Sequence, residues 1–197
     1  MSIAILGGTF DPIHFGHLIV AEQAYNRFKL EKIIFMPAGN PPHKDNNNLS
    51  SAKKRYKMIQ LATNNNDHFS CSNWEMKRDK PSYTVDTLRY FENEGIDDIH
   101  FIIGADSLLD IPEWREPEYL LKNAKFIVAR RPSFSLEKIW ENELIKNYKN
   151  NIYLMESILI DISSTLIKNN KKNNKSIRYL TPDSVVDYIN DNKIYFD

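Results

Sequence analysis

The stretch Gly-Gly-Thr-Phe-Asp-Pro-Ile-His-Phe-Gly-His, from Gly7 to His17, decides the fold class of this chain. A short apolar run at residues 3–6 precedes it, and a helical pattern follows it directly. A buried strand that leads into a glycine turn and then a helix is the arrangement with which α/β proteins bind phosphate. The turn also carries two histidines, His14 and His17. We therefore expect a phosphate-binding loop with candidate catalytic side chains.

Apolar runs of strand length alternate with helical patterns along the rest of the chain. The expected strands cover residues 3–6, 33–36, 69–73, 99–103, 125–129 and 152–155. The expected helices cover residues 16–29, 51–64, 83–94 and 135–147. Strands that alternate with helices form βαβ units. The sequence therefore predicts an α/β fold with a doubly wound, mostly parallel, Rossmann-like sheet.

The C-terminal part of the chain has a different pattern. Residues 162–168 lead into a helix, and a polar loop rich in Asn and Lys follows. Thr181-Pro182-Asp183 is typical of a helix start, with a threonine cap and proline at the first helical position. We expect a small helical segment over 156–197 that packs on the sheet. With the core at 1–155, it would form a single domain over 1–197.

The composition argues against several classes of protein. Lys and Arg number 26 and so do Asp and Glu, so no net charge points to nucleic acid or an anionic membrane. The lone Cys71 cannot form an intrachain disulfide, and its place on an expected strand favours a core role over a nucleophile. No apolar stretch approaches the roughly 20 residues of a membrane span. We expect a cytoplasmic protein, and its oligomeric state, a homo-oligomer included, stays open.

The fold also predicts which loops bind ligands. In a doubly wound sheet, ligands bind at the carboxyl ends of the strands. The corresponding loops cover residues 7–16, 37–45, 104–114, 130–134 and 161–165. Five of the six glycines lie in these loops, namely Gly7, Gly8, Gly16, Gly39 and Gly104.

The two histidines of the turn allow three interpretations. As zinc ligands, His14 and His17 would need one or two further partners, and the sequence offers no evident third ligand. As structural residues, they would be ordinary singly but unusual as a pair before a helix. As donors to phosphoryl oxygens, they lie where free N–H groups already favour an anion. We favour the third interpretation.

At these residues the chain resembles a known family. The segment from Gly7 to His17 is similar to the signature of the nucleotidylyltransferase superfamily, with its His-x-Gly-His tetrad. Residues 162–168, Ile-Ser-Ser-Thr-Leu-Ile-Lys, are similar to the second signature of that group, Ser-Ser-Thr-x-Ile-Arg. Residues 36–44, 81–88 and 103–107, together with Trp114, extend the resemblance almost end to end. More narrowly, the chain resembles the bacterial nicotinate-nucleotide adenylyltransferases.

The resemblance implies a reaction and a set of residues. The family joins nicotinate mononucleotide to the AMP part of ATP, forming deamido-NAD and pyrophosphate in NAD biosynthesis. His14 and His17 would then be catalytic, and Lys44, Tyr83, Thr84 and Trp114 would bind the mononucleotide. The implied ATP-binding residues are Gly7, Gly8, Thr9, Phe10, Gly16, Gly104, Asp106, Arg130, Ser164, Thr165 and Lys168. The partners would be ATP and nicotinate mononucleotide, with Mg²⁺ carried by ATP.

Several of these residues also have a structural interpretation. Asp106 can cap a helix that begins near Ser107, Trp114 can fill the core, and Lys44 can be a solvated loop charge. Lys168 stands where the family usually has arginine, and lysine cannot offer the planar bidentate contact. Arg130 or its neighbour Arg131 can share the phosphate contact.

The chemistry requires no general base. A phosphate monoester has a second pKa of about 6, so the nucleophile is already largely dianionic at neutral pH. Positioning and electrostatic stabilisation would therefore supply nearly all of the rate. Rival acceptors are nicotinamide mononucleotide, pantetheine phosphate or, with CTP, a cytidylyl acceptor. An alternative that is not an enzyme is a module that binds a nucleotide without turnover. The intact His14, His17 and Thr165 argue against it.

Overall fold

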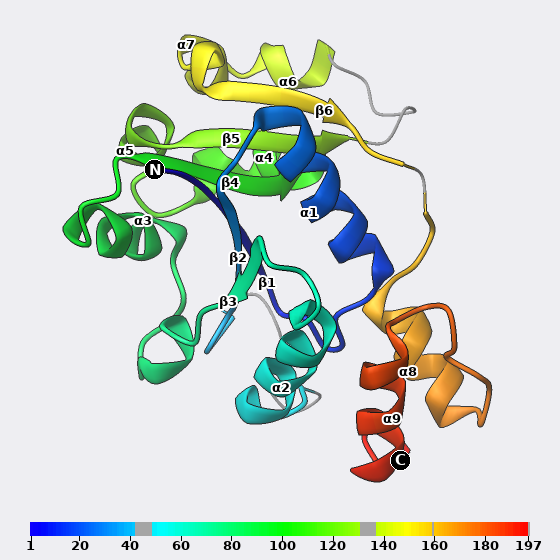
Figure 1. The fold of residues 1–197 in the computed structure, drawn as a ribbon. Coiled ribbons are helices and arrows are strands. Elements are labelled where there is room, and N and C mark those ends of the chain that lie inside the picture. Colours follow the sequence, from blue (N-terminus) through cyan, green and yellow to red (C-terminus); the bar gives the residue numbers. More distant parts are fainter. Residues whose placement is uncertain (42–48, 131–136, 159, 197) are drawn as a thin grey trace.

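A computed structural model describes residues 1–41, 49–130, 137–158 and 160–196 (Figure 1). Within these residues, six strands form one sheet in the order β3-β2-β1-β4-β5-β6. They are β1 (Ser2–Gly8), β2 (Lys32–Pro37), β3 (Phe69–Cys71), β4 (Asp98–Gly104), β5 (Lys125–Arg130) and β6 (Ile152–Glu156). Every neighbouring pair in this sheet is parallel. The expected strands and the doubly wound sheet are confirmed.

The first three expected helices are confirmed to within one residue at each end. They are α1 (Phe15–Phe28), α2 (Ala52–Thr63) and α3 (Thr84–Asn93). Where one helix was expected at 135–147, the structure has α6 (Glu137–Glu141) and α7 (Glu143–Asn147). The break follows from Asn142, whose side chain accepts from the backbone N–H of Ile145 at 3.3 Å and starts a new helix.

Further short elements lie outside the four helices that the sequence analysis expected in the first 155 residues. They are α4 (Ala105–Asp110), α5 (Pro117–Asn123) and the 3-10 turns η2 (Glu75–Lys77), η3 (Ile111–Glu113) and η4 (Lys149–Asn151). With at most 7 residues each, they are too short for a clear helical period. None of the described helices is long and apolar enough to cross a membrane.

Helices cover both faces of the sheet. Because side chains alternate along a strand, Ala4 and Leu6 face one side of β1 while Ile3 and Ile5 face the other. The first side packs against α1, α2 and the C-terminal helices α8 (Ser164–Lys172) and α9 (Asp183–Asp191). The second side packs against α3, α4, α5, α6 and α7. Two buried clusters therefore enclose the central strands.

The strand order reverses beside β1. Its neighbours are β2 on one side and β4 on the other, and Leu6 is in register with both Phe35 and Ile102. This register brings Gly7 and Gly8 to the same edge of the sheet as Gly104. A crevice is expected outside the strands at such a reversal.

The C-terminal helix α9 packs against α2, and α8 and α9 both contribute to the buried cluster on the first side of the sheet (Figure 1). The expected threonine cap is wrong, because α9 begins at Asp183 with Pro182 in the capping position. The buried hydroxyl of Thr181 instead donates to the carbonyl oxygen of Ile13 at 2.7 Å. Close by, the backbone N–H of Phe15 donates to the carbonyl oxygen of Leu180 at 3.1 Å. These two hydrogen bonds join the C-terminal segment to residues 7–17.

Candidate active site

A cavity of about 450 Å³, here called the main cavity, opens at the carboxyl ends of β1 and β4. Seven residues expected from the sequence line it: Gly7, Gly8, Gly16, His17, Gly104, Thr84 and Trp114. A Cβ atom added at Gly7 or Gly104 would meet nothing within 4 Å. Both glycines therefore keep the main chain open to the space that a ligand would fill.

Packing of Phe10 fixes the turn after β1. Phe10 has a left-handed backbone, with φ of 50°, although it is not glycine. Its side chain is only 2% exposed, and its ring lies 5.9 Å from that of Phe35 and 4.9 Å from that of His17. Burial of the ring offsets a backbone strain on the order of 1 kcal/mol. A Cβ at Gly8 would lie 3.0 Å from the Phe10 ring, which accounts for the second glycine.

The carbonyl groups of this turn are directed into the protein. The carbonyl oxygen of Gly8 accepts from the backbone N–H of Ala38 at 2.9 Å. The carbonyl oxygen of Thr9 accepts from Nη1 of Arg55 at 2.8 Å. In a trans peptide, the next N–H points opposite to the carbonyl. The N–H groups of Thr9 and Phe10 therefore point away from β2 and α2, as a main-chain anion contact requires.

His14 and His17 form a stacked pair at the start of α1. Their ring centroids are 3.7 Å apart with an interplanar angle of 27°. The backbone N–H of His14 donates to Nδ1 of His17 at 3.2 Å. Because Nδ1 accepts this bond, a neutral His17 ring carries its proton on Nε2. His17, at the wall of the main cavity, can then act as a hydrogen-bond donor.

His14 is the buried member of the pair. It is 7% exposed, and burial lowers its pKa to about 4, so the ring is neutral at neutral pH. Its Nδ1 is buried and has no hydrogen-bond partner within the described part of the chain. A Cβ at Gly16 would lie 3.0 Å from this nitrogen, so glycine is needed for the ring to take this position. His14 borders a cavity of about 220 Å³ that shares Gly16 and His17 with the main cavity.

The second signature meets the first at the start of α8. The side chain of Ser163 accepts from the backbone N–H of Leu166 at 3.1 Å and caps the helix. The hydroxyl of Ser164 donates to the carbonyl oxygen of Pro12 at 2.8 Å. Thr165 is exposed in the first turn. The N-terminal ends of α1 and α8 thus lie near each other, and their free N–H groups favour an anion there.

Asp11 is a buried carboxylate behind the turn. It is 2% exposed and accepts from the hydroxyl of Tyr195 at 2.5 Å and from the backbone N–H of Ser50 at 3.4 Å. Nζ of Lys168 lies 3.3 Å from the same carboxylate. The structure therefore shows Lys168 in an ion pair, and its contact with ATP phosphates stays a prediction. Burial, followed by the nearby Asp11, raises the pKa of Tyr195.

Arg55 of α2 supports the signature turn, and the sequence analysis missed it. Its guanidinium is 2% exposed and donates to carbonyl oxygens of Thr9 and Ala38, both at 2.8 Å, and of Ser50 at 3.1 Å. Burial lowers the pKa of Arg55, while the charge of Asp11 acts in the opposite direction. The residue ends the run Lys53-Lys54-Arg55, which reads as an exposed helix face. No signal in this one sequence separates it from its neighbours.

Three of the expected mononucleotide residues, Tyr83, Thr84 and Trp114, lie at or beside the main cavity. Tyr83 occupies the capping position of α3, which begins at Thr84. Beside them lies a cavity of about 300 Å³, here called the Arg115 cavity, lined by Ser82, Tyr83, Thr84, Glu113, Trp114, Arg115 and Leu120. Trp114 borders both cavities and also packs against the core. Its two expected roles, core packing and ring contact, are compatible.

Glu75 is a second residue that the sequence analysis missed. Its side chain borders the main cavity, is 8% exposed and accepts from the hydroxyl of Thr87 at 2.6 Å. Burial raises its pKa. A Cβ at Gly39 would lie 2.4 Å from the carbonyl oxygen of Glu75, and the N–H of Gly39 donates to the Ser82 hydroxyl at 3.1 Å. The loop after β2 is thereby held against the start of α3.

The remaining expected residues have more varied surroundings. Asp106 is exposed in the first turn of α4, whose capping position is Gly104, so the cap interpretation of Asp106 is wrong. Arg130 forms an ion pair with Glu156 at the ends of β5 and β6. Lys44 and Arg131 lie outside the described residues. Burial raises the pKa of Cys71 to about 12, so the thiol is protonated at neutral pH, in keeping with the core role expected for it.

Metal ligands do not gather in the part of the chain that the structure describes. No group of three or more His, Cys, Asp and Glu side chains there could hold a metal ion. The site instead offers backbone N–H groups, two imidazoles and a lysine. The N–H groups and the lysine can donate hydrogen bonds to an anion such as phosphate.

Comparison with known proteins agrees with this geometry. Residues 5–170 match a family model described as cytidylyltransferase-like. A protein of Moorella thermoacetica described as a probable nicotinate-nucleotide adenylyltransferase is 43% identical over 98% of this chain and 91% of its own length. A protein of Clostridium tetani with the same description is 39% identical over 98% of both chains.

A solved structure shows the same fold. Nicotinic acid mononucleotide adenylyltransferase of Plasmodium falciparum, complexed with NaAD, superposes with a TM-score of 0.79 over 98% of this chain and 97% of its own. Its sequence identity is 23%, so this likeness supports the fold alone. The relatives near 40% identity carry the assignment instead. This chain belongs to the nicotinate-nucleotide adenylyltransferase family of cytidylyltransferase-like proteins.

Proposed function

We propose that this chain transfers AMP from ATP to nicotinate mononucleotide (NaMN) and releases pyrophosphate. The observation that carries the proposal is the continuity of the main cavity. It runs from the main chain at Gly8 and the ring of His17 to Thr84 and Trp114. A phosphate-binding end and an aromatic end are what the two ends of a nucleotide acceptor require. The family relatives and the NaAD complex of the Plasmodium enzyme support the same substrate pair.

The reaction is a single displacement. An oxygen of the NaMN phosphate forms a bond to the α-phosphorus of ATP, and the bond from that phosphorus to the bridging oxygen breaks. The electron pair leaves with pyrophosphate, and the product is deamido-NAD. Because the attacking phosphate is already largely dianionic, no proton has to be removed first. The protein's task is to bring two anions together and to stabilise the leaving charge.

The groups for this task lie at the signature turn. The outward N–H groups of Thr9 and Phe10, the Nε2 donor of His17 and the adjoining starts of α1 and α8 all favour phosphate oxygens. We assign ATP to this end, with Gly7, Gly104, Asp106 and Thr165 around it. His14 supports His17 through the stacked rings. Lys168, held by Asp11, and Arg130, held by Glu156, lie in ion pairs that a phosphate could share.

The nicotinate ring belongs at the other end. Trp114 offers an aromatic surface at the wall of both cavities. Tyr83 and Thr84 stand where α3 begins, so backbone N–H groups are available there for a carboxylate. Lys44 remains our candidate for the mononucleotide phosphate.

Mg²⁺ would arrive with the ATP phosphates as part of the substrate. Within the described residues, no group of three or more metal-ligating side chains is present, which suits a metal held chiefly by phosphate oxygens. We also propose that residues 156–197 form one domain with residues 1–155. The hydrogen bonds of Ser164 to Pro12 and of Thr181 to Ile13 support this.

The decisive experiment offers three acceptors separately with Mg·ATP and measures pyrophosphate release. The acceptors are NaMN, nicotinamide mononucleotide and pantetheine phosphate. We expect the highest kcat/KM with NaMN. A preference for either of the other two would overturn the choice of acceptor, and absence of turnover with all three would favour a sensing module.

A further inference from the structure

We propose that Arg115 selects the acceptor by charge. Its guanidinium would favour a pyridine ring that carries a carboxylate over the same ring with an uncharged carboxamide. The inference rests on the proposed function, because it assumes that an acceptor ring contacts Trp114. It assigns a specificity role to a side chain that no signature of the sequence contains.

The position of Arg115 is set by its neighbours. It lies between η3 and α5, and Glu116 after it has a left-handed backbone with φ of 53° before Pro117 begins α5. The Arg115 guanidinium lies 5.2 Å from the centroid of the Tyr83 ring. This contact places the charge at the start of α3, in the wall of the Arg115 cavity with Thr84 and Trp114.

The order of groups in the cleft decides which part of the acceptor meets this charge. The acceptor phosphate must reach the α-phosphorus of ATP at the signature turn. Its ring would lie against Trp114, which borders both cavities. The ring substituent is then directed away from the reacting phosphates. The Arg115 cavity adjoins the main cavity through their shared residues Ser82, Thr84 and Trp114, so we expect the ring substituent to face it.

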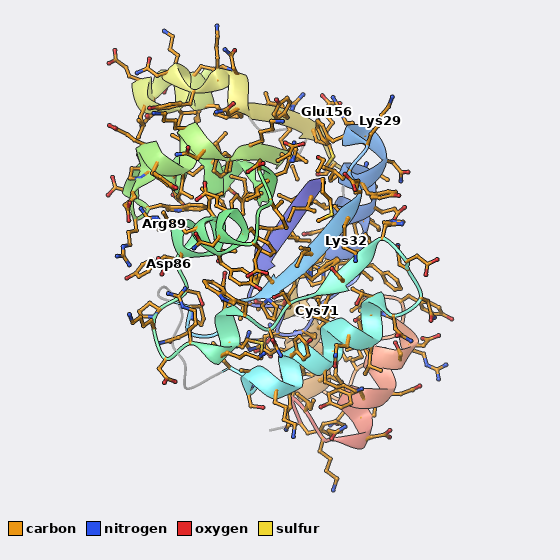
Figure 2. All side chains as sticks on the ribbon, turned by 60° about the vertical axis from the view of Figure 1, so that its left-hand side comes forward. Lys29, Lys32, Cys71, Asp86, Arg89 and Glu156 are labelled. Carbon is orange, nitrogen blue, oxygen red and sulfur yellow. The ribbon has the colours of Figure 1, made fainter. Side chains whose placement is uncertain are left out.

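Neighbouring charges leave most of the Arg115 charge available. Glu116 receives two hydrogen bonds from Arg89, at 2.9 and 2.5 Å, whereas its distance to Nε of Arg115 is 3.9 Å. Asp86 is paired with Arg78 at 2.9 Å. Figure 2 shows Asp86 and Arg89 together on α3. The remaining carboxylate at this cavity is Glu113, which is exposed.

The two candidate rings differ most in charge. Nicotinate carries a carboxylate that attracts a guanidinium, whereas nicotinamide carries a neutral amide of similar size. A site whose N–H donors and guanidinium face a neutral amide gains much less binding free energy than one that faces a carboxylate. The Arg115 side chain is 53% exposed, so water and salt weaken its attraction. We therefore expect a moderate preference from this residue alone.

The test compares kcat/KM for NaMN and for nicotinamide mononucleotide in the wild-type protein and Arg115→Ala. We expect the ratio of the two values to fall about fivefold, through a higher KM for NaMN, with the value for nicotinamide mononucleotide nearly unchanged. Arg115→Lys keeps the charge and should retain most of the ratio. Glu113→Gln removes the opposing carboxylate and should raise the ratio.

Arg27→Ala is the matched control. The Arg27 guanidinium also lies over an aromatic ring, 5.8 Å from the centroid of Phe28, at the far end of α1. This variant should leave the ratio unchanged. A wild-type preference for NaMN that survives intact in Arg115→Ala would overturn the role of Arg115 and leave the proposed function standing. A wild-type protein that prefers nicotinamide mononucleotide would overturn the proposed function itself.

Discussion

The signature turn is held by charged and polar side chains that are buried, whereas the charged groups around Trp114 lie near the surface. Behind the turn, Asp11 and Arg55 are each 2% exposed, and His14 is 7% exposed. At the other end of the cleft, the side chains of Arg115 and Glu116 are 53% and 37% exposed. Both ends border the same main cavity through Gly8 and Trp114.

This difference separates two properties of the enzyme. At the turn, buried groups fix the main chain that would hold the phosphates, so a change in one of these buried groups should alter both the fold and the reaction. Around Trp114, exposed side chains can be replaced at little cost in stability. Acceptor choice should therefore be easier to change than reaction class.

The largest effect is expected for His17→Ala. Removing a donor that stabilises charge in the transition state should lower kcat about 10²- to 10³-fold while the protein stays folded. Steady-state pyrophosphate release gives kcat, and circular dichroism checks the fold. The control is His68→Ala. His68 stacks on Tyr25 with centroids 3.6 Å apart and bonds to Glu22 at 2.8 Å, away from the cavity.

We expect His68→Ala to lower the melting temperature and to leave kcat unchanged. If His17→Ala retained wild-type kcat, the reaction would depend on the main chain and the metal alone. The stacked histidines would then be structural.

The next effect concerns stability. Arg55→Met would leave three partly buried carbonyl oxygens, those of Thr9, Ala38 and Ser50, without this donor. We expect the free energy of unfolding to fall by about 3 kcal/mol, measured by urea denaturation. Lys53→Met, an exposed position in the same turn of α2, should change it by less than about 0.5 kcal/mol. Similar losses for both variants would contradict the structural role of Arg55.

The buried ring of His14 predicts a dependence of stability on pH. Its pKa is lowered from 6.5 to about 4 on folding, so between these values the unfolded chain binds more protons than the folded one. This contribution to stability is present above the unfolded pKa and is lost as the pH falls. Between about pH 7.5 and about pH 5 it should remove about 2 kcal/mol.

Urea denaturation across this pH range measures the effect, with His14→Asn as the comparison. On acidification, the free energy of unfolding should fall by about 2 kcal/mol more for the wild-type protein than for the variant. Parallel pH profiles would show that His14 titrates normally in the folded state.

The sequence predicted the sheet and the signature turn because both depend on local patterns. Alternating apolar runs mark buried strands, and the glycines with His14 and His17 follow one another along the chain. The helix expected at 135–147 was divided by a single side-chain cap at Asn142. Asparagine is a common cap residue, but the sequence alone does not show whether it interrupts a helical pattern that continues on both sides.

The residues that hold the site in place could not be predicted from the sequence, for another reason. Arg55, Glu75 and Tyr195 act through contacts with partners distant in sequence, as in the bond from Tyr195 to Asp11. Their roles follow from burial, and burial of an isolated polar side chain leaves no period or spacing in one sequence. Lys168 shows the converse: its motif was evident, but its pairing with Asp11 was not.

The smallest effect is expected at the surface-exposed end, for Trp114→Ala. Loss of the aromatic wall should raise KM for NaMN about tenfold, equivalent to about 1.4 kcal/mol, and change KM for ATP and kcat much less. Trp74→Ala is the control, because Trp74 stacks on Tyr90 at 4.6 Å and should affect stability alone. A variant whose only defect is a lower melting temperature would assign Trp114 to the core. Acceptor binding would then depend on the start of α3 and on Arg115, and the two ends of the cleft would differ less than their exposure suggests.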